Sequence, residues 1–557
     1  MESVNEHTDK NHINVGILLK RMADAQPYKR AVVFPAGRDE EDRVAYTHLT
    51  FQELERESDC IAHGLHRAGI RRGTKTILMV TPSIEFFALT FALFKTGAVP
   101  VVVDPGMGIK RMIQCFQETQ PEGFIGIPKA HILRLLYPKF FKTVKTWITV
   151  GKRWFWGGLT LKQIRQFPWK PFQLANTMRH EMAAVLFTTG STGPAKGAVY
   201  THGIFDAQIR HIQAHFEITS DEIDLPTFPL FALFDPALGM TAVIPDMDPT
   251  RPADVDPEKI IGPVLNQGVT NMFASPALLN RVGRYGQNKS IKLPSLKRVV
   301  SAGAPVSAAN IEQFASMLSG SAEIHTPYGA TEAVPVISIA SEEIISETKA
   351  LSEKGYGTCV GRPLEGLEVR IIKTMDDPII EWTDKLSVPH GDIGEITVKG
   401  DLVTRNYFEK PRADALAKIK DGQDIWHRMG DLGWKDKKGR FWFCGRKSHR
   451  VITEKETLFT IPCEAIFNQH PRVYRSALVG VGAPGKQRPV ICVELEPDDK
   501  GKNKKKLKQE LFEMAKQHEH TRNIEAILFH KKFPVDIRHN SKIFRETLAV
   551  WAERQLL

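Results

Sequence analysis

Cysteine is scarce in this sequence, and its spacing excludes several kinds of site. The chain of 557 residues has only 6 cysteines, and no two of them form a Cys-x-x-Cys pair. They are Cys60, Cys115, Cys359, Cys444, Cys463 and Cys492. A zinc ribbon, a dithiol redox motif and a disulfide scaffold all need closer or paired spacing. We therefore expect reduced thiols that mostly pack in the interior.

Long hydrophobic runs are also absent. The longest apolar stretch, residues 86–103, is interrupted by Lys95, Gly97 and Pro100, which favours a helix, a turn and a strand over a membrane span. The first ten residues contain acidic side chains and no apolar core, so they do not have the pattern of a signal peptide. The sequence therefore predicts no transmembrane segment and a cytoplasmic location.

Acidic residues are outnumbered, with 64 Asp and Glu against 75 Lys and Arg. Part of the net charge of +11 lies in a run of lysines at residues 500–508 that contains no aromatic side chain. A solvated helix face or loop explains this run better than a nucleic-acid site does, so we expect no nucleic-acid partner. A second basic segment, residues 139–156, does contain aromatic residues. One interpretation is a partly buried segment, and the alternative is peripheral docking to a membrane surface or to a partner protein.

Glycine and hydroxyl side chains are concentrated in residues 188–197, Thr-Thr-Gly-Ser-Thr-Gly-Pro-Ala-Lys-Gly. An apolar run before this stretch predicts a buried strand, and apolar spacing after it predicts a helix. Glycines let consecutive backbone N–H groups point at one site, and Lys196 adds a positive charge, so the loop suits a polyphosphate. The order differs from the Gly-Lys-Ser/Thr of a Walker loop, which disfavours P-loop kinases and GTPases. A flexible surface loop is the alternative.

The order of the expected elements indicates an α/β fold divided into domains. Residues 15–180 and 200–345 alternate helical periodicity with short β-rich runs, which predicts two α/β layers with parallel strands. Residues 355–445 consist of short strands and turns and indicate a β-rich subdomain. We expect residues 1–445 to form a large N-terminal domain and residues 446–557 to form a small α+β C-terminal domain.

Several ordered motifs, spread over nearly the whole chain, are similar to those of the adenylate-forming enzymes. This family includes acyl-CoA synthetases, firefly luciferase and the adenylation domains of peptide synthetases. The motifs are residues 188–197, Tyr-Gly-Ala-Thr-Glu at 328–332, residues 394–411, Met-Gly-Asp at 429–431, Gly-Arg at 445–446 and residues 534–545. Within the family, the sequence looks closest to the β-lactone synthetases of bacterial long-chain olefin biosynthesis. Residues 231–239, 244–252, 301–306, 442–447 and 537–540 carry this narrower likeness.

The resemblance implies that the chain uses ATP and Mg²⁺. The phosphates of ATP would be held by Thr188, Thr189, Gly190, Ser191, Thr192, Gly193 and Lys196. Tyr328 would lie against adenine, Thr331 would hydrogen-bond the α-phosphate, and Glu332 would bind Mg²⁺, a cation that prefers oxygen ligands. Taken alone, Glu332 is equally well explained as a carboxylate at the start of a helix.

The resemblance also assigns residues to the rest of the nucleotide and to the reaction. The adenine slot would be lined by Gly303, Ala304 and Pro305. Asp431 would accept the ribose hydroxyls, and Arg446 would bind the ribose or phosphate edge. Lys542 matches the mobile lysine of the small domain, whose ammonium would bridge the substrate carboxylate and the α-phosphate. In isolation, turn chemistry explains Asp431 and a surface position explains Lys542.

Two positions depart from the acyl-CoA synthetases of the family. In the expected hinge at residues 445–450, Ser448 or His449 stands where those enzymes usually carry an acidic residue. Thr457 stands five residues before the Pro-Cys-Glu segment at 462–464, where those enzymes carry a glycine that lines the pantetheine tunnel. A Cβ and a hydroxyl should narrow such a tunnel, so CoA as the acceptor is in doubt.

The resemblance thus implies adenylation of a 2-alkyl-3-hydroxy fatty acid, with release of pyrophosphate. The substrate's own β-hydroxyl would then attack the acyl-AMP, closing a β-lactone and releasing AMP. Phe231, Phe234 and Asp235 are candidates for the substrate pocket, although core packing explains the apolar side chains almost equally well. The alternatives are a fatty-acyl-CoA or fatty-acyl-AMP ligase, amino-acid adenylation suggested by the Phe234-Asp235 pair, and a non-catalytic nucleotide-binding scaffold. By pathway analogy, the lactone decarboxylase and the reductase that makes the hydroxy acid are expected partners.

Overall fold

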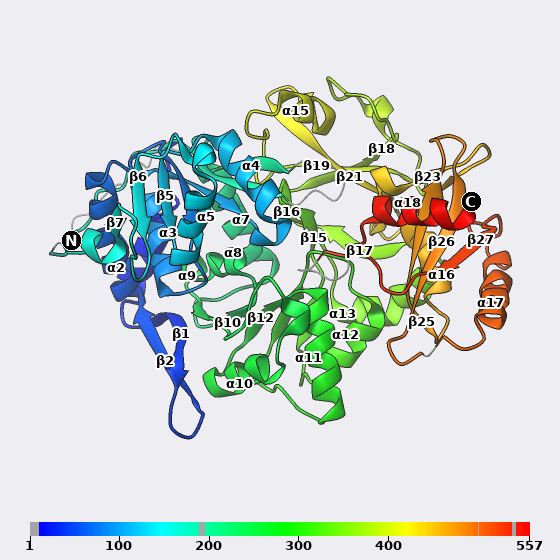
Figure 1. Ribbon diagram of the computed structural model, residues 1–557, viewed down its shortest axis with the longest axis horizontal. Coiled ribbons are helices and arrows are strands. Elements are labelled where there is room, and N and C mark those ends of the chain that lie inside the picture. Colours follow the sequence, from blue (N-terminus) through cyan, green and yellow to red (C-terminus); the bar gives the residue numbers. More distant parts are fainter. Residues whose placement is uncertain (1–10, 167, 189–194, 500, 537–541) are drawn as a thin grey trace.

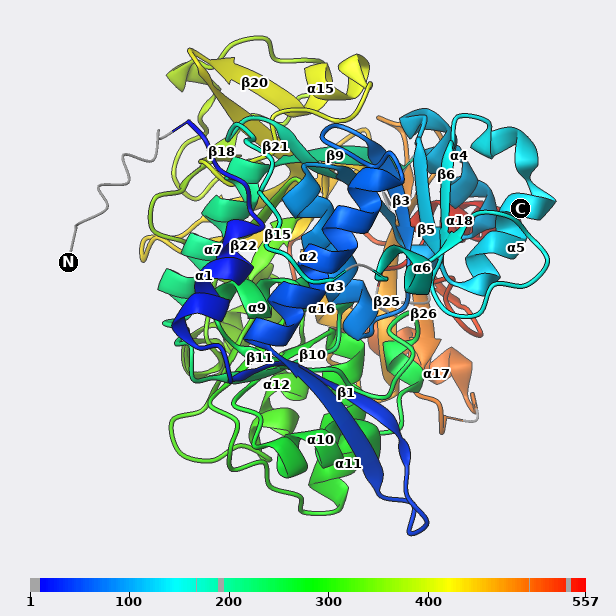
Figure 2. The same cartoon turned by 90° about the vertical axis from the view of Figure 1, so that its left-hand side faces the viewer.

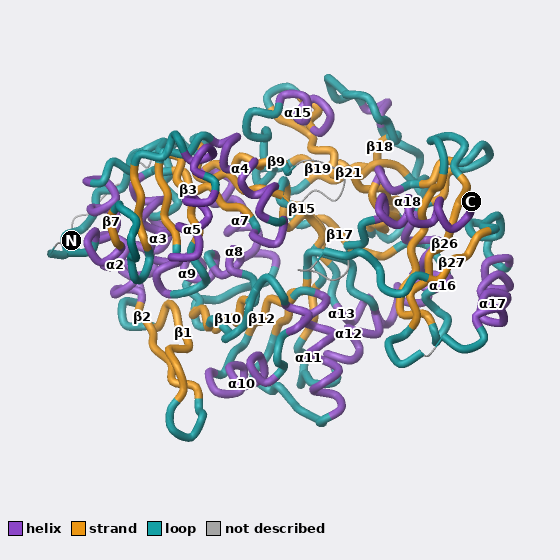
Figure 3. Tube along the Cα trace, in the orientation of Figure 1, coloured by secondary structure: helices purple, strands orange, loops and turns teal. Residues whose placement is uncertain are grey.

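The computed structural model describes residues 11–166, 168–188, 195–499, 501–536 and 542–557. Within these ranges the chain forms two sheets of seven strands, one of eight, and two smaller sheets. Figure 1 shows an elongated molecule, with strands β6 (Thr146–Thr149) and β7 (Leu159–Thr160) near one end and the elements of the last hundred residues at the other. Figure 3 shows the strands in the interior with most helices outside them. The predicted α/β fold class is confirmed.

The first sheet is parallel except at one edge. Its strands are β3 (Lys75–Met79), β4 (Val99–Val103), β5 (Gly123–Gly126), β6 (Thr146–Thr149), β7 (Leu159–Thr160), β8 (Met182–Thr188) and β9 (Lys196–Thr201), in the order β7-β6-β5-β3-β4-β8-β9. The helices on it are α2 (Phe51–Arg67), α3 (Ile84–Thr96), α4 (Ile109–Thr119) and α5 (Pro128–Leu136). Helices α2 and α3 pack on the face that carries Leu78, and α4 and α5 pack on the face that carries Ile77. Consecutive side chains of a strand point to opposite faces, which explains this division.

The glycine-rich loop connects two paired strands. Strand β9 pairs antiparallel with β8, so that Thr188 lies opposite Lys196. The predicted strand before the loop is β8, and the predicted helix after it is α7 (His202–His215), whose N-terminus is capped by Thr201. The sequence did not predict β9 between them. As a result, sheet pairing holds the Lys196 backbone beside the end of β8.

The second sheet lies against the first layer. Its strands are β1 (Arg30–Arg38), β2 (Val44–Thr50), β10 (Ile223–Pro226), β11 (Thr241–Val243), β12 (Asn271–Ala274), β13 (Arg298–Ser301) and β14 (Glu323–His325), in the order β14-β13-β12-β10-β11-β1-β2. All pair in parallel except β1 with β2, whose hairpin projects from the body in Figure 2. One face packs against α10 (Glu258–Gln267), α11 (Pro276–Asn288) and α12 (Ala308–Ala315). The carboxyl ends of such parallel strands form the edge where open α/β sheets bind ligands.

The third sheet is antiparallel. Its strands are β15 (Tyr328–Ala330), β16 (Ala333–Ser338), β17 (Thr358–Pro363), β18 (Glu368–Ile372), β19 (Gly394–Lys399), β20 (Lys418–Asp421), β21 (Asp424–Lys435) and β22 (Phe441–Arg446). Residues 355–445, which we expected to be rich in strands, contribute β17 to β22. The sheet also includes β15 and β16, so the Tyr-Gly-Ala-Thr-Glu motif begins at one edge of it.

The C-terminal part has its own small sheets. Its elements are β23 (Val451–Ile452), β24 (Thr457–Leu458), α16 (Thr460–Phe467), β25 (Val473–Val481), β26 (Arg488–Leu495), α17 (Lys504–Lys516), β27 (Ala526–Phe529) and α18 (Arg545–Leu556). Strand β26 pairs antiparallel with β25 and parallel with β27. These elements gather at the right-hand end of Figure 1. The boundary at residues 445 and 446 between two domains stays a prediction.

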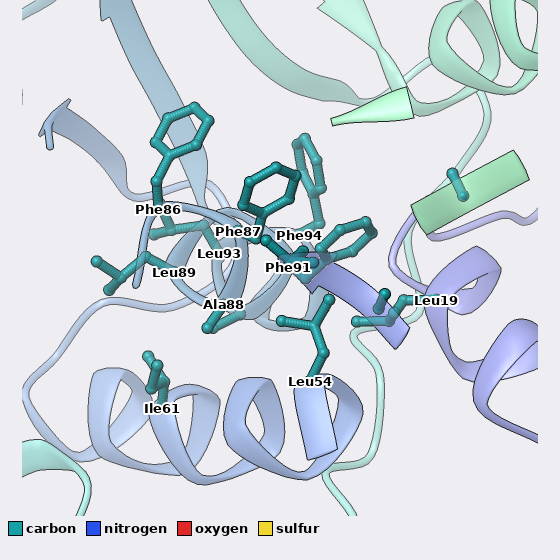
Figure 4. Packing of buried hydrophobic residues seen from close by; sticks show 14 of the residues in the cluster. Leu19, Leu54, Ile61, Phe86, Phe87, Ala88, Leu89, Phe91, Leu93 and Phe94 are labelled. Atoms are coloured by element: carbon teal, nitrogen blue, oxygen red, sulfur yellow. The ribbon is translucent and has the colours of Figure 1, made fainter. Parts of the chain in front are cut away.

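The longest apolar stretch of the sequence forms part of a buried core. Residues 86–103 fold into the end of α3, a turn and β4, as predicted. Figure 4 shows Ala88 of α3 above Leu54 of α2, and both side chains are fully buried. Lys95 is also buried, and its Nζ lies 2.6 Å from Oδ1 of Asp59. No helix in the described ranges is both long and apolar enough to cross a membrane.

Candidate active site

One cavity of about 2020 Å³ brings together residues from distant parts of the chain. Its walls include Lys196, Gly303, Ala304, Pro305, Tyr328, Thr331, Glu332, Asp431, Arg446 and Lys542. Ligand pockets commonly measure about 300–1,000 Å³, so this cavity has room for a nucleotide beside a second molecule. Thr188 ends β8, and the residues from Thr189 to Gly193 lie outside the described ranges, so the phosphate-binding role of the loop stays a prediction.

Tyr328, Asp431 and Arg446 form a hydrogen-bonded group on the cavity wall. Asp431 on β21 lies opposite Arg446 on β22 in the sheet register. The Tyr328 hydroxyl donates to Asp431 Oδ2 at 2.7 Å, and Arg446 Nη1 donates to Asp431 Oδ1 at 2.7 Å. The Asp431 carboxylate raises the pKa of Arg446, and burial followed by the charge of Asp431 raises the pKa of Tyr328. A carboxylate accepts about four hydrogen bonds, so Asp431 keeps acceptor capacity for two ligand hydroxyls.

Glu332 is held by two residues of the motif at 394–411 to which the sequence resemblance assigned no role. The Tyr407 hydroxyl donates to Glu332 Oε1 at 2.6 Å, and the Thr404 N–H donates to the Glu332 carbonyl oxygen at 2.9 Å. The adjacent Thr331 carbonyl accepts from the Tyr200 hydroxyl at 2.5 Å. These bonds fix both the main chain and the carboxylate at the end of the motif. Hydrogen bonds to an ionised group are about twice as strong as neutral ones, so Tyr407 is a strong restraint on Glu332.

Two lysines lie close to the Tyr407 ring. The Nζ of Lys196 is 5.1 Å from the centre of the Tyr407 ring, and the Nζ of Lys418 is 5.6 Å from it. Lys418 is buried and donates to the carbonyl oxygen and the hydroxyl of Thr404. Burial lowers the pKa of Lys418 to about 7. Lys418 therefore stabilises Thr404 from the protein interior, whereas Lys196 lines the cavity.

The segment after β13 lines the cavity with small residues, which let a ligand come close to the main chain. Gly303 has a φ of +99°, a conformation that L side chains rarely adopt. The Ser301 hydroxyl lines the same cavity, is buried, and has no hydrogen-bond partner within the described part of the chain. A buried unpaired hydroxyl is costly unless a ligand or water satisfies it. The wall formed by Gly303, Ala304 and Pro305 thus suits a polar, flat ligand such as a purine.

Phe231 and Phe234 line the cavity as expected, but Asp235 does not. The Phe231 ring stacks on Phe273, with their centres 4.3 Å apart. Phe234 and Asp235 are neighbours in the short helix α9 (Phe234–Leu238), so their side chains point about 100° apart. Asp235 is therefore buried, away from the wall. The place of Asp235 in the substrate pocket stays a prediction, and its side chain does not line this cavity.

Asp235 is instead paired with Asp224. Burial and then the charge of Asp224 raise the pKa of Asp235, and burial raises the pKa of Asp224 to about 7. Two neighbouring buried carboxyl groups do not both ionise readily, because burial and the repulsion of like charges oppose the second charge. A carboxylate that would hold a substrate amino group is thus not available to the cavity from this position, which disfavours amino-acid adenylation.

Lys542 reaches the cavity from the C-terminal part. Its backbone N–H donates to Asp536 Oδ1 at 3.0 Å, and the Asp536 N–H donates to the Lys542 carbonyl at 3.1 Å. Three residues further on, the Arg545 guanidinium bonds both carboxylate oxygens of the buried Glu464, with Nη2 3.0 Å from Oε2. This ion pair fastens the segment that carries Lys542 to α16. The predicted segment 537–540 lies outside the described residues.

The hinge residues are in contact with the C-terminal part, whereas Thr457 is exposed. His449 Nε2 lies 3.4 Å from Glu546 Oε1 in α18, so one of the two candidates for the non-acidic hinge position contacts the C-terminal helix. A Cβ on Gly445 would come within 2.1 Å of the Thr460 hydroxyl, so this position needs glycine. Thr457 is exposed and is not on the cavity wall. Whether Thr457 narrows a CoA tunnel stays a prediction.

The described residues contain no cluster of three or more His, Cys, Asp or Glu that could hold a metal ion. Mg²⁺ is usually held by one or two carboxylates together with substrate phosphates and water, and Glu332 as its protein ligand stays a prediction. The donor set fits a metal that arrives with a nucleotide.

The chain is similar in sequence and in fold to known proteins along almost its whole length. The chain is 46% identical to an olefin β-lactone synthetase of Xanthomonas campestris pv. campestris, over 97% of this chain and 98% of that one. It is 45% identical to an olefin β-lactone synthetase of Stenotrophomonas maltophilia, over 98% of both chains. The amide bond synthetase McbA of Marinactinospora thermotolerans shares the fold, with a TM-score of 0.79, 19% identity, and coverage of 96% of this chain and 99% of that one. The sequence profile described as AMP-binding enzyme matches residues 19–408, so the chain belongs to the AMP-binding enzyme family.

Proposed function

We propose that the protein uses ATP to convert a 2-alkyl-3-hydroxy fatty acid into a β-lactone. The observation that carries this proposal is the shared cavity, where Tyr328, Asp431 and Lys542 lie on the same walls as the apolar Phe231 and Phe234. Polar groups suited to a nucleotide and apolar groups suited to an alkyl chain thus face one space. The relatives at 45–46% identity support the lactone as product.

In the first step, a carboxylate oxygen of the substrate attacks the α-phosphorus of ATP, and the bond to pyrophosphate breaks. We assign the adenine to Tyr328 and the wall after β13, and the ribose to Asp431 with Arg446. Thr331 would donate to the α-phosphate. Lys542 would offset the negative charge that two approaching anions accumulate. Mg²⁺, held through Glu332, would neutralise phosphate charge.

In the second step, the β-hydroxyl oxygen of the same substrate attacks the acyl carbon. A new C–O bond closes the four-membered ring, the acyl–phosphate bond breaks, AMP leaves, and the hydroxyl proton passes to water. No third molecule has to bind, because the nucleophile is already tethered close to the carbonyl. This step explains how the protein could dispense with CoA.

The direct test compares two acids of equal chain length, one with a β-hydroxyl and one without, in the presence of ATP and Mg²⁺. We expect lactone from the hydroxy acid without CoA, detected by mass spectrometry. The plain acid should release pyrophosphate but give no lactone. Product that is a thioester and requires CoA would overturn the proposal in favour of an acyl-CoA ligase, and an accumulating adenylate from both acids would favour an acyl-AMP ligase.

Tyr407→Phe should slow adenylation by about tenfold to a hundredfold, because Glu332 loses a hydrogen bond to its charged carboxylate, worth about 1.5–3 kcal/mol. The Mg²⁺ concentration needed for half-maximal rate should rise as well. Pyrophosphate release at varied Mg²⁺ measures both effects. Tyr356→Phe, a change at an exposed tyrosine, is the matched control. Equal Mg²⁺ dependence in Tyr407→Phe and wild type would contradict the role of Tyr407.

The proposed reaction requires one enzyme that supplies its substrate and another that consumes its product. A β-lactone needs an enzyme that consumes it, and a β-hydroxy acid needs a reductase that makes it from a β-keto acid. We retain the lactone decarboxylase and that reductase as proposed partners.

A further inference from the structure

The charge of one long segment is entirely of one sign. Between Glu122 and Glu181 the sequence contains 11 Lys and Arg residues and no Asp or Glu. The segment covers β5, α5, β6 and β7 at the outer part of the first sheet. In Figure 2, α5 lies toward the right-hand edge of the molecule. A surface of this kind attracts anions and repels basic partners.

Large apolar side chains are exposed in the same segment. The exposed fraction is 82% for Phe155, 51% for Trp154 and 69% for Leu136. Leu135 and Tyr137 at the end of α5 are exposed as well. We refer to Leu135, Leu136, Tyr137, Trp154 and Phe155 as the α5 surface. Exposed apolar residues grouped in this way mark an interaction site.

The α5 surface has two parts, the end of α5 and the loop that carries Trp154 and Phe155. Contacts between α5 and this loop hold the two parts next to each other. The Trp156 ring stacks on His131 of α5, with their centres 5.3 Å apart. Arg134 of α5 donates to the carbonyl oxygen of Gly157 at 3.3 Å. Trp156 itself is buried, so the loop is fixed while its neighbours Trp154 and Phe155 remain exposed. The arrangement presents aromatic rings to the outside on a rigid support.

The inner side of α5 faces the active-site cavity. Ala130 and Leu133 line the cavity, and so does Lys129, which is exposed at the start of α5. Ile109 at the start of α4 also lines the cavity and is 52% exposed. The cavity therefore reaches the surface between the starts of α4 and α5, on the same helix that carries part of the α5 surface.

We propose that the α5 surface docks on an anionic lipid bilayer, and that the alkyl substrate enters the cavity between α4 and α5. Aromatic side chains with an apolar body and a polar atom favour the membrane interface, and Lys152 and Arg153 beside them suit anionic headgroups. The segment itself supplies no acidic side chain beside Lys152 and Arg153, which favours an anionic lipid over a protein partner, since protein interfaces pair charges of both signs. The entry route rests on the proposed function, whereas the membrane contact does not.

Flotation of the purified full-length protein with lipid vesicles tests the contact without any turnover. We expect binding to vesicles of equimolar phosphatidylcholine and phosphatidylglycerol, weakened by salt, and little binding to phosphatidylcholine alone. Lys152→Gln/Arg153→Gln should bind about thirtyfold more weakly, because each basic residue near an anionic surface contributes about fivefold. Trp154→Ala/Phe155→Ala should lose at least about tenfold from the buried apolar area. Lys504→Gln/Lys505→Gln on exposed α17 removes the same charge and should leave binding unchanged.

Three results would overturn the membrane contact. They are an absence of binding to either vesicle, an equal loss in the α17 control, and a change of oligomeric state in Trp154→Ala/Phe155→Ala that shows the surface to be a protein interface. The entry route has its own readout, since this variant should slow turnover of acid supplied in vesicles but not in detergent micelles. Equal slowing from both sources would remove the entry route and leave the binding result intact.

Discussion

Lys542→Ala should lower the rate of adenylation by about a hundredfold to a thousandfold while ATP still binds. The ammonium is expected to act where charge builds up at the α-phosphorus, and removal of one such group from a preorganised site costs about a hundredfold to a thousandfold or more. The proposed nucleotide contacts at Tyr328, Asp431 and Arg446, which hydrogen-bond to one another in other parts of the chain, should be untouched. Pyrophosphate release measures the rate, and calorimetric titration measures ATP binding.

The matched control for Lys542→Ala is Lys531→Ala, an exposed lysine in the same C-terminal region. The control should keep the wild-type rate, which separates loss of a particular charge from loss of general positive potential. Unchanged pyrophosphate release in Lys542→Ala would refute the assigned role. Loss of ATP binding together with the rate would instead show that Lys542 holds the nucleotide itself.

Arg545→Ala should reduce the free energy of unfolding of the C-terminal part by about 3–5 kcal/mol. The change leaves the buried Glu464 carboxylate without its partner, and an unpaired buried charge is strongly destabilising. Burial already raises the pKa of Glu464, and the charge of Arg545 opposes that rise. Because Arg545 lies three residues after Lys542, we also expect a slower adenylation rate in protein that is still folded.

Arg554→Ala is the control for Arg545→Ala, since it removes an exposed arginine from the same helix. It should change the denaturation midpoint little. Replacing both partners, as in Glu464→Leu/Arg545→Leu, should recover much of the lost stability, because no charge is then left unpaired. A double variant as unstable as Arg545→Ala would show that the loss comes from packing rather than from the carboxylate.

Much of the fold follows from local sequence pattern. Residues 86–103 divide into a helix, a turn and a strand because Lys95, Gly97 and Pro100 interrupt the apolar run, and the structure has these elements. The family resemblance predicted that Tyr328, Asp431, Arg446 and Lys542 belong to one site. The four residues line one cavity in the structure. Their proximity does not follow from local sequence pattern, because most of them are far apart in the chain.

The missed features depend on contacts between distant residues. Tyr407 lies 75 residues from the Glu332 carboxylate to which it donates, and nothing in its local pattern indicates that bond. Strand β9 is stabilised by its pairing with β8, so its short sequence alone did not predict it. The sequence also could not show that Asp235 lies off the cavity wall, because the direction of a side chain in α9 depends on where that short helix begins.

The central claim is that Lys542 meets the reacting atoms across a cavity shared with the nucleotide site. A crystal structure with a non-hydrolysable acyl-sulfamoyl analogue of the adenylate tests this claim most directly. We predict adenine against Tyr328, ribose hydroxyls on Asp431, the alkyl chain beside Phe231, and the Lys542 ammonium within hydrogen-bonding distance of the sulfamoyl group. An analogue bound in the cavity with no approach of Lys542, or bound elsewhere, would contradict the account.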